Sequence, residues 1–327
     1  MQSYLNANPD WVYTDLSSKR KPAALGLLKN GHRVELKPIK LDGEKYVLSN
    51  TCAFDAFVQL LCSAYHDSVA LKALVDRQNE TLFKLIRQVS QHGVGTVAYK
   101  QRAEIMKAVY NIQRLPENIY RINGECCIAS LVKTVWLFPV ITEVSLCSSE
   151  NCPDATRTNE LQILTVQLSN AEQIVMLEKH IQTVLRDRIT NCLKEVTEYS
   201  DQLDSGSYVV DRTLSDWPLC DGRRTCTMRI NDNYFFAEVI VPNPHSTIEV
   251  AARLLDLPQH VTVQNKTFFL RGVIGFTGGT KKTDIGHYVA FCYRGRDYWQ
   301  SFDDLRNSVS NCNAKTVVRI HVLFYAV

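Results

Sequence analysis

A polar triplet followed by a long apolar run constrains the fold of this chain more than any other stretch. The triplet is residues 49–51 (Ser, Asn, Thr), and side-chain oxygens of these types accept the unpaired amide hydrogens of a first helical turn. The pattern therefore predicts a helix that begins near Cys52 and continues to about Tyr65. The chain has 327 residues, 45% of them hydrophobic, which suffices for one large domain with a full core.

The position of Cys52 in the first turn of this helix favours nucleophilic chemistry. The positive end of the helix dipole stabilises a thiolate over a thiol, and the thiolate is the nucleophilic form. Cysteines in apolar helices are more often small core residues. A second feature is therefore needed to distinguish a nucleophile from a core cysteine.

Far along the chain, a hairpin pattern supplies that second feature. Residues 286–293 alternate and are rich in aromatic residues, as strands are, and residues 294–297 are of turn type. The strand that follows would bring His287 close to Asp303 or Asp304. A carboxylate holds a histidine in one tautomer and stabilises its imidazolium form, so these residues suit a base and its orienting acid. Of the eight histidines, His287 alone has such a strand partner.

The two stretches together resemble the Cys box and the His box of the ubiquitin-specific protease family of papain-like cysteine peptidases. The motifs that carry the resemblance are Asn50-Thr51-Cys52, Gly286-His287-Tyr288-Val289-Ala290-Phe291, Trp299, Phe302-Asp303-Asp304 and Ile320-His321-Val322-Leu323-Phe324-Tyr325. The resemblance implies that Cys52 is the nucleophile, His287 the base and Asp303 the orienting acid. Asp304 is the alternative acid.

Two positions depart from the family pattern. The position five residues before the nucleophile usually holds an asparagine that stabilises the oxyanion, and here it is Val47. The resemblance then leaves the backbone amide of Cys52 and a second donor, Asn50 or Ser49, for the oxyanion. Asp55 departs from the family pattern as well. At this position the chain is similar to a divergent branch of the fold that cleaves the modifier SUMO.

The resemblance implies an α+β fold in one catalytic domain, with a helical thumb, a β-rich palm and a finger extension. We expect a lead-in over residues 1–48, the thumb over 49–139, the fingers over 140–230 and the palm over 231–327. A long amphipathic helix is predicted within the fingers, because apolar residues recur at helical spacing over residues 174–196.

Two cysteine pairs in the finger region are candidate zinc ligands. Cys147 and Cys152 form a C-x4-C pair, and Cys220 and Cys226 form a C-x5-C pair. Four thiolates suit a tetrahedral structural zinc, although C-x2-C is the usual spacing of such pairs. The sequence leaves open whether these residues hold one structural zinc or are reduced cysteines in a finger that has lost its metal. No catalytic cofactor is expected.

Composition and charge exclude several other functions. The net charge is +3 and the one basic cluster, residues 19–21, is short, so we expect no nucleic-acid partner. No stretch approaches about 18 uninterrupted apolar residues, so no membrane span is expected. Eleven cysteines without an N-terminal signal pattern predict reduced thiols and a cytoplasmic or nuclear location. The adjacent Cys126 and Cys127 are interpreted as core residues.

The resemblance implies a thiol-dependent deubiquitinase-type isopeptidase that cleaves after the terminal diglycine of ubiquitin, with ubiquitin or ubiquitin-like conjugates as partners. The loop over residues 277–285 precedes His287 and would gate the entry of such a tail. Three alternatives remain open. They are an isopeptidase for SUMO or another ubiquitin-like modifier, a degenerate protease that binds ubiquitin without cleaving it, and a papain-like protease for ordinary peptides.

Overall fold

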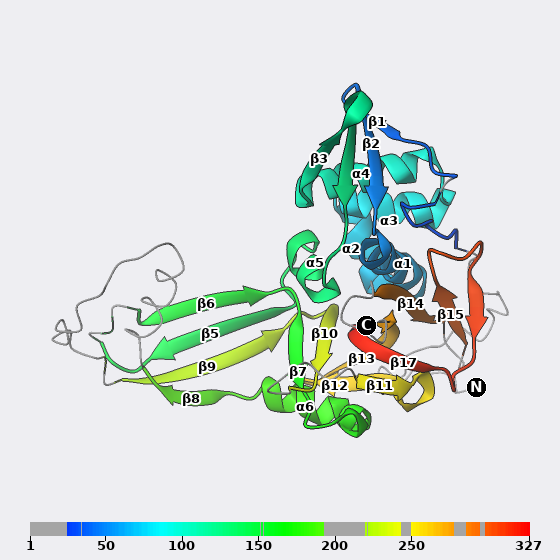
Figure 1. Ribbon diagram of the computed structural model, residues 1–327. Coiled ribbons are helices and arrows are strands. Elements are labelled where there is room, and N and C mark those ends of the chain that lie inside the picture. Colours follow the sequence, from blue (N-terminus) through cyan, green and yellow to red (C-terminus); the bar gives the residue numbers. More distant parts are fainter. Residues whose placement is uncertain are drawn as a thin grey trace, which may run out of the picture.

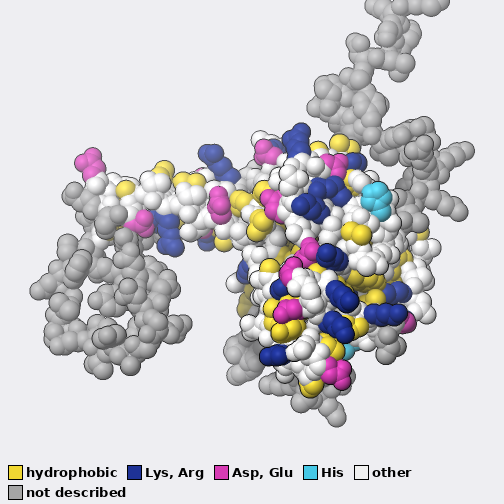
Figure 2. Space-filling model, turned by 90° about the horizontal axis from the view of Figure 1, so that it is seen from above, with side chains coloured by type: hydrophobic (Ala, Val, Ile, Leu, Met, Phe, Trp, Pro, Cys, Tyr) yellow, Lys and Arg dark blue, Asp and Glu magenta, His cyan; other side chains and the backbone are white. Residues whose placement is uncertain are grey.

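The computed structural model describes residues 25–33, 35–150, 152, 154–192, 220, 222–242, 250–277, 286–294 and 298–327. Over these residues, a group of helices lies at one end, a large sheet lies beside it, and a narrow arm of strands extends away from both (Figure 1). Figure 2 shows the same arm from above. Most helices gather at one end and the sheets are mostly antiparallel, so the predicted α+β fold class is confirmed.

The helix predicted at Cys52 is α1 (Cys52–Asp67), at the centre of the helical part. Its residues 53–65 are all buried, because other helices cover one side and strands of the large sheet cover the other. The surrounding helices are α2 (Val69–Arg77), α3 (Thr81–His92), α4 (Thr96–Val109) and α5 (Ile128–Val135). A small sheet adjoins them, in the order β1 (Ile39–Leu41), β2 (Glu44–Ser49), β4 (Ile119–Asn123), β3 (Ile112–Leu115).

The large sheet positions the second half of the predicted site. Its main path is β16 (Ser310–Cys312), β15 (Trp299–Phe302), β14 (His287–Tyr293), β13 (Lys266–Thr277), β17 (Val317–Ala326), β10 (Tyr234–Ile240) and β7 (Leu164–Gln167), with β11 (Val250–Arg253) on β17 and β12 (His260–Val263) on β13. The predicted hairpin is the antiparallel pair β14 and β15, in which Ala290 lies opposite Phe302. This register brings His287, at the start of β14, level with the residues that follow Phe302.

Aromatic side chains hold α1 against this sheet. The ring of Trp136 lies 6.3 Å from that of Phe57 on α1 and 5.4 Å from that of Phe236 on β10. Phe236 in turn stacks on Phe324 of β17 at 4.5 Å. Edge-to-face and stacked pairs add stabilisation to the burial itself, so the helix that carries Cys52 is fixed relative to the sheet.

The arm is a sheet in the order β6 (Thr156–Leu161), β5 (Ile141–Cys147), β9 (Arg223–Ile230), β8 (Arg188–Asn191). The long helix predicted over residues 174–196 is wrong in its second half. A 3₁₀ segment (Ala171–Met176) leads into α6 (Leu177–Val184), and the chain then forms β8. All residues of β8 are exposed, and all of them pair with β9. The hydrogen bonds of this strand pairing decide the local structure against the helix that the apolar spacing predicts. Residues 193–196 lie outside the described part.

Other predicted features take a different form or lie outside the described residues. The predicted helical thumb also contains β3 and β4, between α4 and α5, and the lead-in contains β1 and most of β2. The basic cluster at residues 19–21 and residues 278–285 of the predicted loop are not described. Further 3₁₀ segments are Pro116–Asn118 and Leu254–Asp256. Among the described helices, none combines the length and the apolar character that crossing a membrane requires.

Candidate active site

The candidate nucleophile, Cys52, is the first residue of α1. The chain turns into the helix at Asn50, which adopts a left-handed conformation with φ of 53°. Thr51 occupies the N-cap position, but its hydroxyl donates to the carboxylate of Asp55 and does not cap the helix. The amides of the first turn are therefore not satisfied by the N-cap side chain, and they point to the region where the helix dipole favours a thiolate.

The candidate base, His287, lies at the start of β14, and its Nε2 is 2.9 Å from Oδ1 of Asp303. Asp303 also accepts hydrogen bonds from the backbone amide of Leu305 at 3.1 Å and from Nε of Arg306 at 3.2 Å. Burial alone would lower the pKa of His287, but hydrogen bonds with Asp303 and with the thiol of Cys52 raise it to about 10. Because Nε2 faces Asp303, Nδ1 is the nitrogen that remains for the thiol.

Cys52 and His287 both line a cleft of about 530 Å³ between the helical part and the large sheet. Gly286, the residue before the base, is required there by close packing. A Cβ atom at this position would lie 1.8 Å from Cζ of Phe276, which lines the same cleft. The glycine of the His box therefore lets an aromatic ring lie directly beside the base.

Asp304, the alternative acid, is buried next to the imidazole. Its Oδ1 is 3.6 Å from Nε2 of His287, and its Oδ2 accepts a hydrogen bond of 2.7 Å from Nδ2 of Asn30. Burial and the neighbouring charge of Asp55 raise the pKa of Asp304 to about 8, so its carboxyl group is mostly protonated near neutral pH. By distance and by charge, Asp303 is better placed than Asp304 to orient the base.

A buried ion pair connects the start of α1 to α4. Nη1 of Arg102 lies 2.8 and 2.9 Å from the two carboxylate oxygens of Asp55, and both side chains are 0% exposed. The same nitrogen donates to the carbonyl of Lys29 at 2.7 Å, and Thr51 also donates to Asp55. These contacts fix the first turn of α1, and with it Cys52, through charges that are costly to leave unpaired.

The predicted oxyanion donor, Asn50, lines the cleft, but its side chain is engaged elsewhere. Its Nδ2 donates to Oδ1 of Asn123 at 2.8 Å. Val47 lies within β2 and offers no side-chain donor, and the hydroxyl of Ser49 accepts a hydrogen bond from Nε of Arg121 at 3.2 Å. The backbone amides at the start of α1 are therefore the donors that the geometry offers most directly, and Asn50 would have to leave Asn123 to add another.

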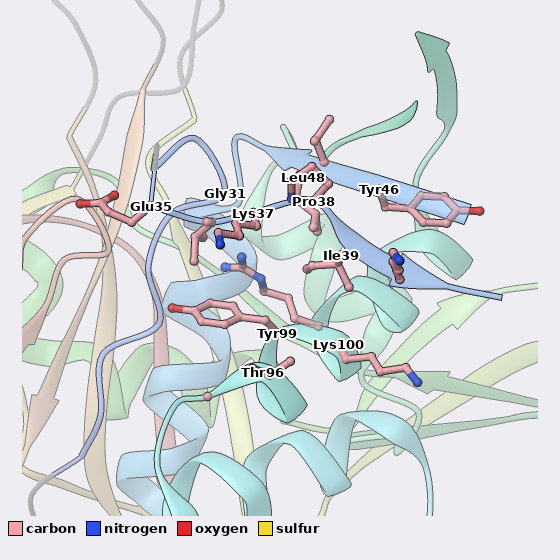
Figure 3. A pocket seen from close by; sticks show the side chains of 15 residues that line it. Gly31, Glu35, Lys37, Pro38, Ile39, Tyr46, Leu48, Thr96, Tyr99 and Lys100 are labelled. Carbon is pink, nitrogen blue, oxygen red and sulfur yellow. The ribbon is translucent and has the colours of Figure 1, made fainter. Parts of the chain in front are cut away.

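A larger cavity, of about 630 Å³, is lined by Val47 and Arg102 but by neither Cys52 nor His287. It is enclosed by residues 35–40, β2 and the start of α4, with Tyr46 and Leu48 on one side and Tyr99 on the other (Figure 3). No cysteine or histidine is among the described residues that line it. The candidate nucleophile and the candidate base therefore line the smaller cleft, and neither is among the described residues that line this cavity.

Four cysteines at the end of the arm form a compact cluster, in which all sulfurs lie within 4.8 Å of one another: Cys147, Cys152, Cys192 and Cys220. The sulfurs of Cys147 and Cys220 are 3.5 Å apart, and those of Cys152 and Cys192 are 3.7 Å apart. A tetrahedral zinc with Zn–S bonds of about 2.3 Å would hold its sulfurs about 3.8 Å apart, so the residues fit this metal. A Cβ atom at Gly222 would lie 2.5 Å from the sulfur of Cys147, so a glycine is needed there.

Cys226, which the sequence predicts as the fourth ligand, is not part of this cluster, and Cys192 takes its place. Cys226 lies within β9 opposite Arg188, whereas Cys192 directly follows β8 and reaches the end of the arm. Nη2 of Arg224 is 3.4 Å from the sulfur of Cys192 and 3.8 Å from that of Cys152. The guanidinium of Arg224 therefore donates to two of the four candidate ligands.

Several residues around the cleft had no signal in the sequence. Asn30 and His32 belong to the lead-in, yet Asn30 bonds Asp304, and His32 lines the cleft, where its Nδ1 accepts from the amide of Asn50 at 3.3 Å. Arg102 lies on α4 and pairs with Asp55 of α1. These contacts join residues far apart in the chain, so no local pattern reveals them.

The comparisons with known proteins give one curated relative and a group of solved structures. No protein-family model matches the chain. The 120.7 kDa protein in the NOF-FB transposable element of Drosophila melanogaster is 23% identical over 316 residues, which cover 91% of this chain. The chain spans about a quarter, 26%, of the length of that relative.

The solved structures to which the chain is similar include SAGA DUB modules that contain Ubp8, Sgf11, Sus1 and Sgf73. A module with a Ubp8 variant bound to monoubiquitin has a TM-score of 0.45 and 12% identity, and the match covers 94% of this chain and 72% of that chain. The module bound to ubiquitin aldehyde has a TM-score of 0.44 and 14% identity, with 91% and 70% covered.

Proposed function

We propose that this chain is a cysteine-type isopeptidase that releases ubiquitin, or a ubiquitin-like modifier, from the lysine side chains of other proteins. The observation that carries the proposal is that Cys52 and His287 line one cleft, with His287 hydrogen-bonded to Asp303. A thiol at a helix N-terminus, a base and an orienting acid are the groups that a cysteine peptidase needs. The class of modifier rests on the resemblance of the Cys box and the His box.

In the proposed reaction, the thiolate of Cys52 attacks the carbonyl carbon of the modifier's terminal glycine. The amides at the start of α1 would stabilise the negative charge on the carbonyl oxygen. His287, as imidazolium, gives its proton to the lysine nitrogen as the carbon–nitrogen bond breaks. Water then attacks the thioester, His287 takes one of its protons, and the glycine leaves as a carboxylate while Cys52 is restored. Asp303 keeps the imidazole in position through both steps.

We also infer that the cysteine cluster of the arm, Cys147, Cys152, Cys192 and Cys220, holds one structural zinc. Four thiolates fill a tetrahedral coordination sphere, so the ion would have no position open to a substrate and would close the end of the arm. All eleven cysteines are free of disulfides. Free thiols and a thiolate site suit a reducing compartment, the cytoplasm or the nucleus.

A second candidate function is binding of the modifier without cleavage. Val47 and the engaged side chain of Asn50 favour it, because loss of one oxyanion donor typically costs about two to three orders of magnitude in turnover. The shared cleft of Cys52 and His287, with Asp303 bonded to the imidazole, opposes it, since binding alone does not need a base beside a thiol. SUMO remains the alternative modifier, because of the similarity of Asp55 to the divergent branch.

Lysine-linked conjugates of ubiquitin and of SUMO, incubated with the wild-type chain and with Cys52→Ala, test the proposal. We expect the wild type to release one of the two modifiers and Cys52→Ala to release neither. Cys312→Ser removes a thiol that does not line the cleft and should leave the rate unchanged. Binding of a modifier by both proteins without release by either would establish the second candidate. Digestion of unfolded protein in preference to both conjugates would indicate an ordinary peptidase.

A further inference from the structure

A second group of potential ligands, outside the catalytic series, lies where the helical part meets the large sheet. It consists of Cys127, Glu238 and His321, and we call it the junction cluster. Cys127 is the N-cap residue of α5, Glu238 lies on β10, and His321 lies on β17, which pairs with β10. Cys127 is exposed and lines the same cleft as Cys52. It is therefore not the core residue that the sequence predicts.

The distances within the junction cluster centre on one imidazole nitrogen. Nε2 of His321 is 3.7 Å from the sulfur of Cys127 and 3.7 Å from Oε1 of Glu238. The three atoms all lie within 4.8 Å of one another. A tetrahedral zinc bound through sulfur at about 2.3 Å and through nitrogen and oxygen at about 2.0–2.2 Å would hold these atoms roughly 3.3–3.6 Å apart. The two distances to Nε2 of His321 are only a few tenths of an ångström longer than this.

Neighbouring groups orient two of the three ligands. Nδ1 of His321 is 3.1 Å from the hydroxyl of Tyr288, and the two rings stack at 5.7 Å. When Nδ1–H donates to this hydroxyl, Nε2 keeps its lone pair for a metal on the side of the cluster. Thr165 donates to Oε2 of Glu238 at 3.1 Å, which leaves Oε1 as the oxygen that faces His321. Support of this kind is what ligating histidines and carboxylates usually receive in metal sites.

We propose that the junction cluster binds a divalent cation of the zinc class, with three protein ligands and one coordination position open towards the cleft. Thiolate, imidazole and carboxylate together favour zinc over the hard cations magnesium and calcium. The three ligands come from α5, β10 and β17, so a bound ion would join the helical part to the large sheet. Binding to the folded chain alone stabilises that state, so the metal should raise the unfolding temperature.

The open position distinguishes the junction cluster from the four-cysteine cluster of the arm. Four thiolates saturate a tetrahedral ion, whereas three ligands leave room for water or another small ligand on the cleft side. The proposal does not depend on the peptidase function, because metal binding can be measured in a chain without the catalytic thiol.

Titration of the full chain with Co²⁺, a spectroscopic probe of zinc sites, tests the proposal. All proteins carry Cys52→Ala, so that the catalytic thiol cannot bind the probe. We expect Cys127→Ser to bind one Co²⁺ fewer per chain than the parent, with loss of thiolate-to-metal absorption, and Glu238→Gln to bind the same ion at least tenfold more weakly. Cys126→Ser is the matched control, because this neighbouring thiol also lines the cleft but contacts Tyr110. It should bind as the parent does.

Thermal unfolding with and without Zn²⁺ provides the second readout. The parent and Cys126→Ser should unfold at higher temperature with the metal, and the rise should be smaller in Cys127→Ser. Thermal unfolding in the presence of a chelator shows whether each variant folds without the metal. If Cys127→Ser does not fold, Glu238→Gln replaces it in the comparison. Equal Co²⁺ binding by the parent and by both cluster variants would overturn the proposal, and the cluster would then be a thiolate–imidazolium pair without metal.

Discussion

Replacement of Arg102 by methionine should destabilise the folded chain by about 3–5 kcal/mol, because Asp55 would keep a buried charge without its partner. Both side chains are 0% exposed, and Arg102 donates to both carboxylate oxygens and to the carbonyl of Lys29. Two charge-assisted hydrogen bonds at roughly 1.5–3 kcal/mol each give a similar loss.

Urea unfolding followed by circular dichroism measures the loss. The double variant Asp55→Asn with Arg102→Met should recover part of the stability, because it also removes the charge that is left without a partner. Arg114→Met, at an exposed arginine, should change the stability by less than about 0.5 kcal/mol. A loss below about 1 kcal/mol in Arg102→Met would refute the reasoning.

Two further predictions concern the base and the arm. The raised pKa of His287 stabilises the folded chain below about pH 6.5, and this stability is lost as the pH rises through about 10. Since Asp303 is one cause of the raised pKa, Asp303→Asn should destabilise the chain more at about pH 6 than above about pH 10. Urea unfolding at the two pH values measures this difference, and equal losses of stability at both pH values would contradict the prediction. Cys192→Ser should remove the zinc of the arm and Cys226→Ser should retain it, as measured by metal content after purification; the reverse pattern would refute the assignment.

The parts of the site that the sequence predicts are those with a local signal. The polar triplet and the apolar run after it locate Cys52 at a helix start, although Thr51 bonds Asp55 and leaves the helix uncapped. Strand alternation around a turn locates the hairpin and therefore places His287 near Asp303. In both cases, residues close in sequence decide the geometry.

The parts that the sequence does not predict depend on pairing between distant segments. Cys192 replaces Cys226 because β8 pairs with β9, and this pairing decides which thiol reaches the end of the arm. The same pairing ends the helix that the apolar spacing predicts beyond residue 184. Asn30 reaches Asp304 across most of the chain, a contact without a sequence pattern.

The central claim is that Cys52 is a nucleophile activated by His287. Ubiquitin and SUMO with an electrophilic group in place of the terminal carboxylate would trap such a nucleophile, and peptide mass spectrometry would identify which of the eleven cysteines carries the adduct. We predict an adduct at Cys52 with one of the two probes, formed more slowly in His287→Ala. A wild-type chain that stays unlabelled at Cys52 with both probes, or that labels equally fast without His287, would contradict the account.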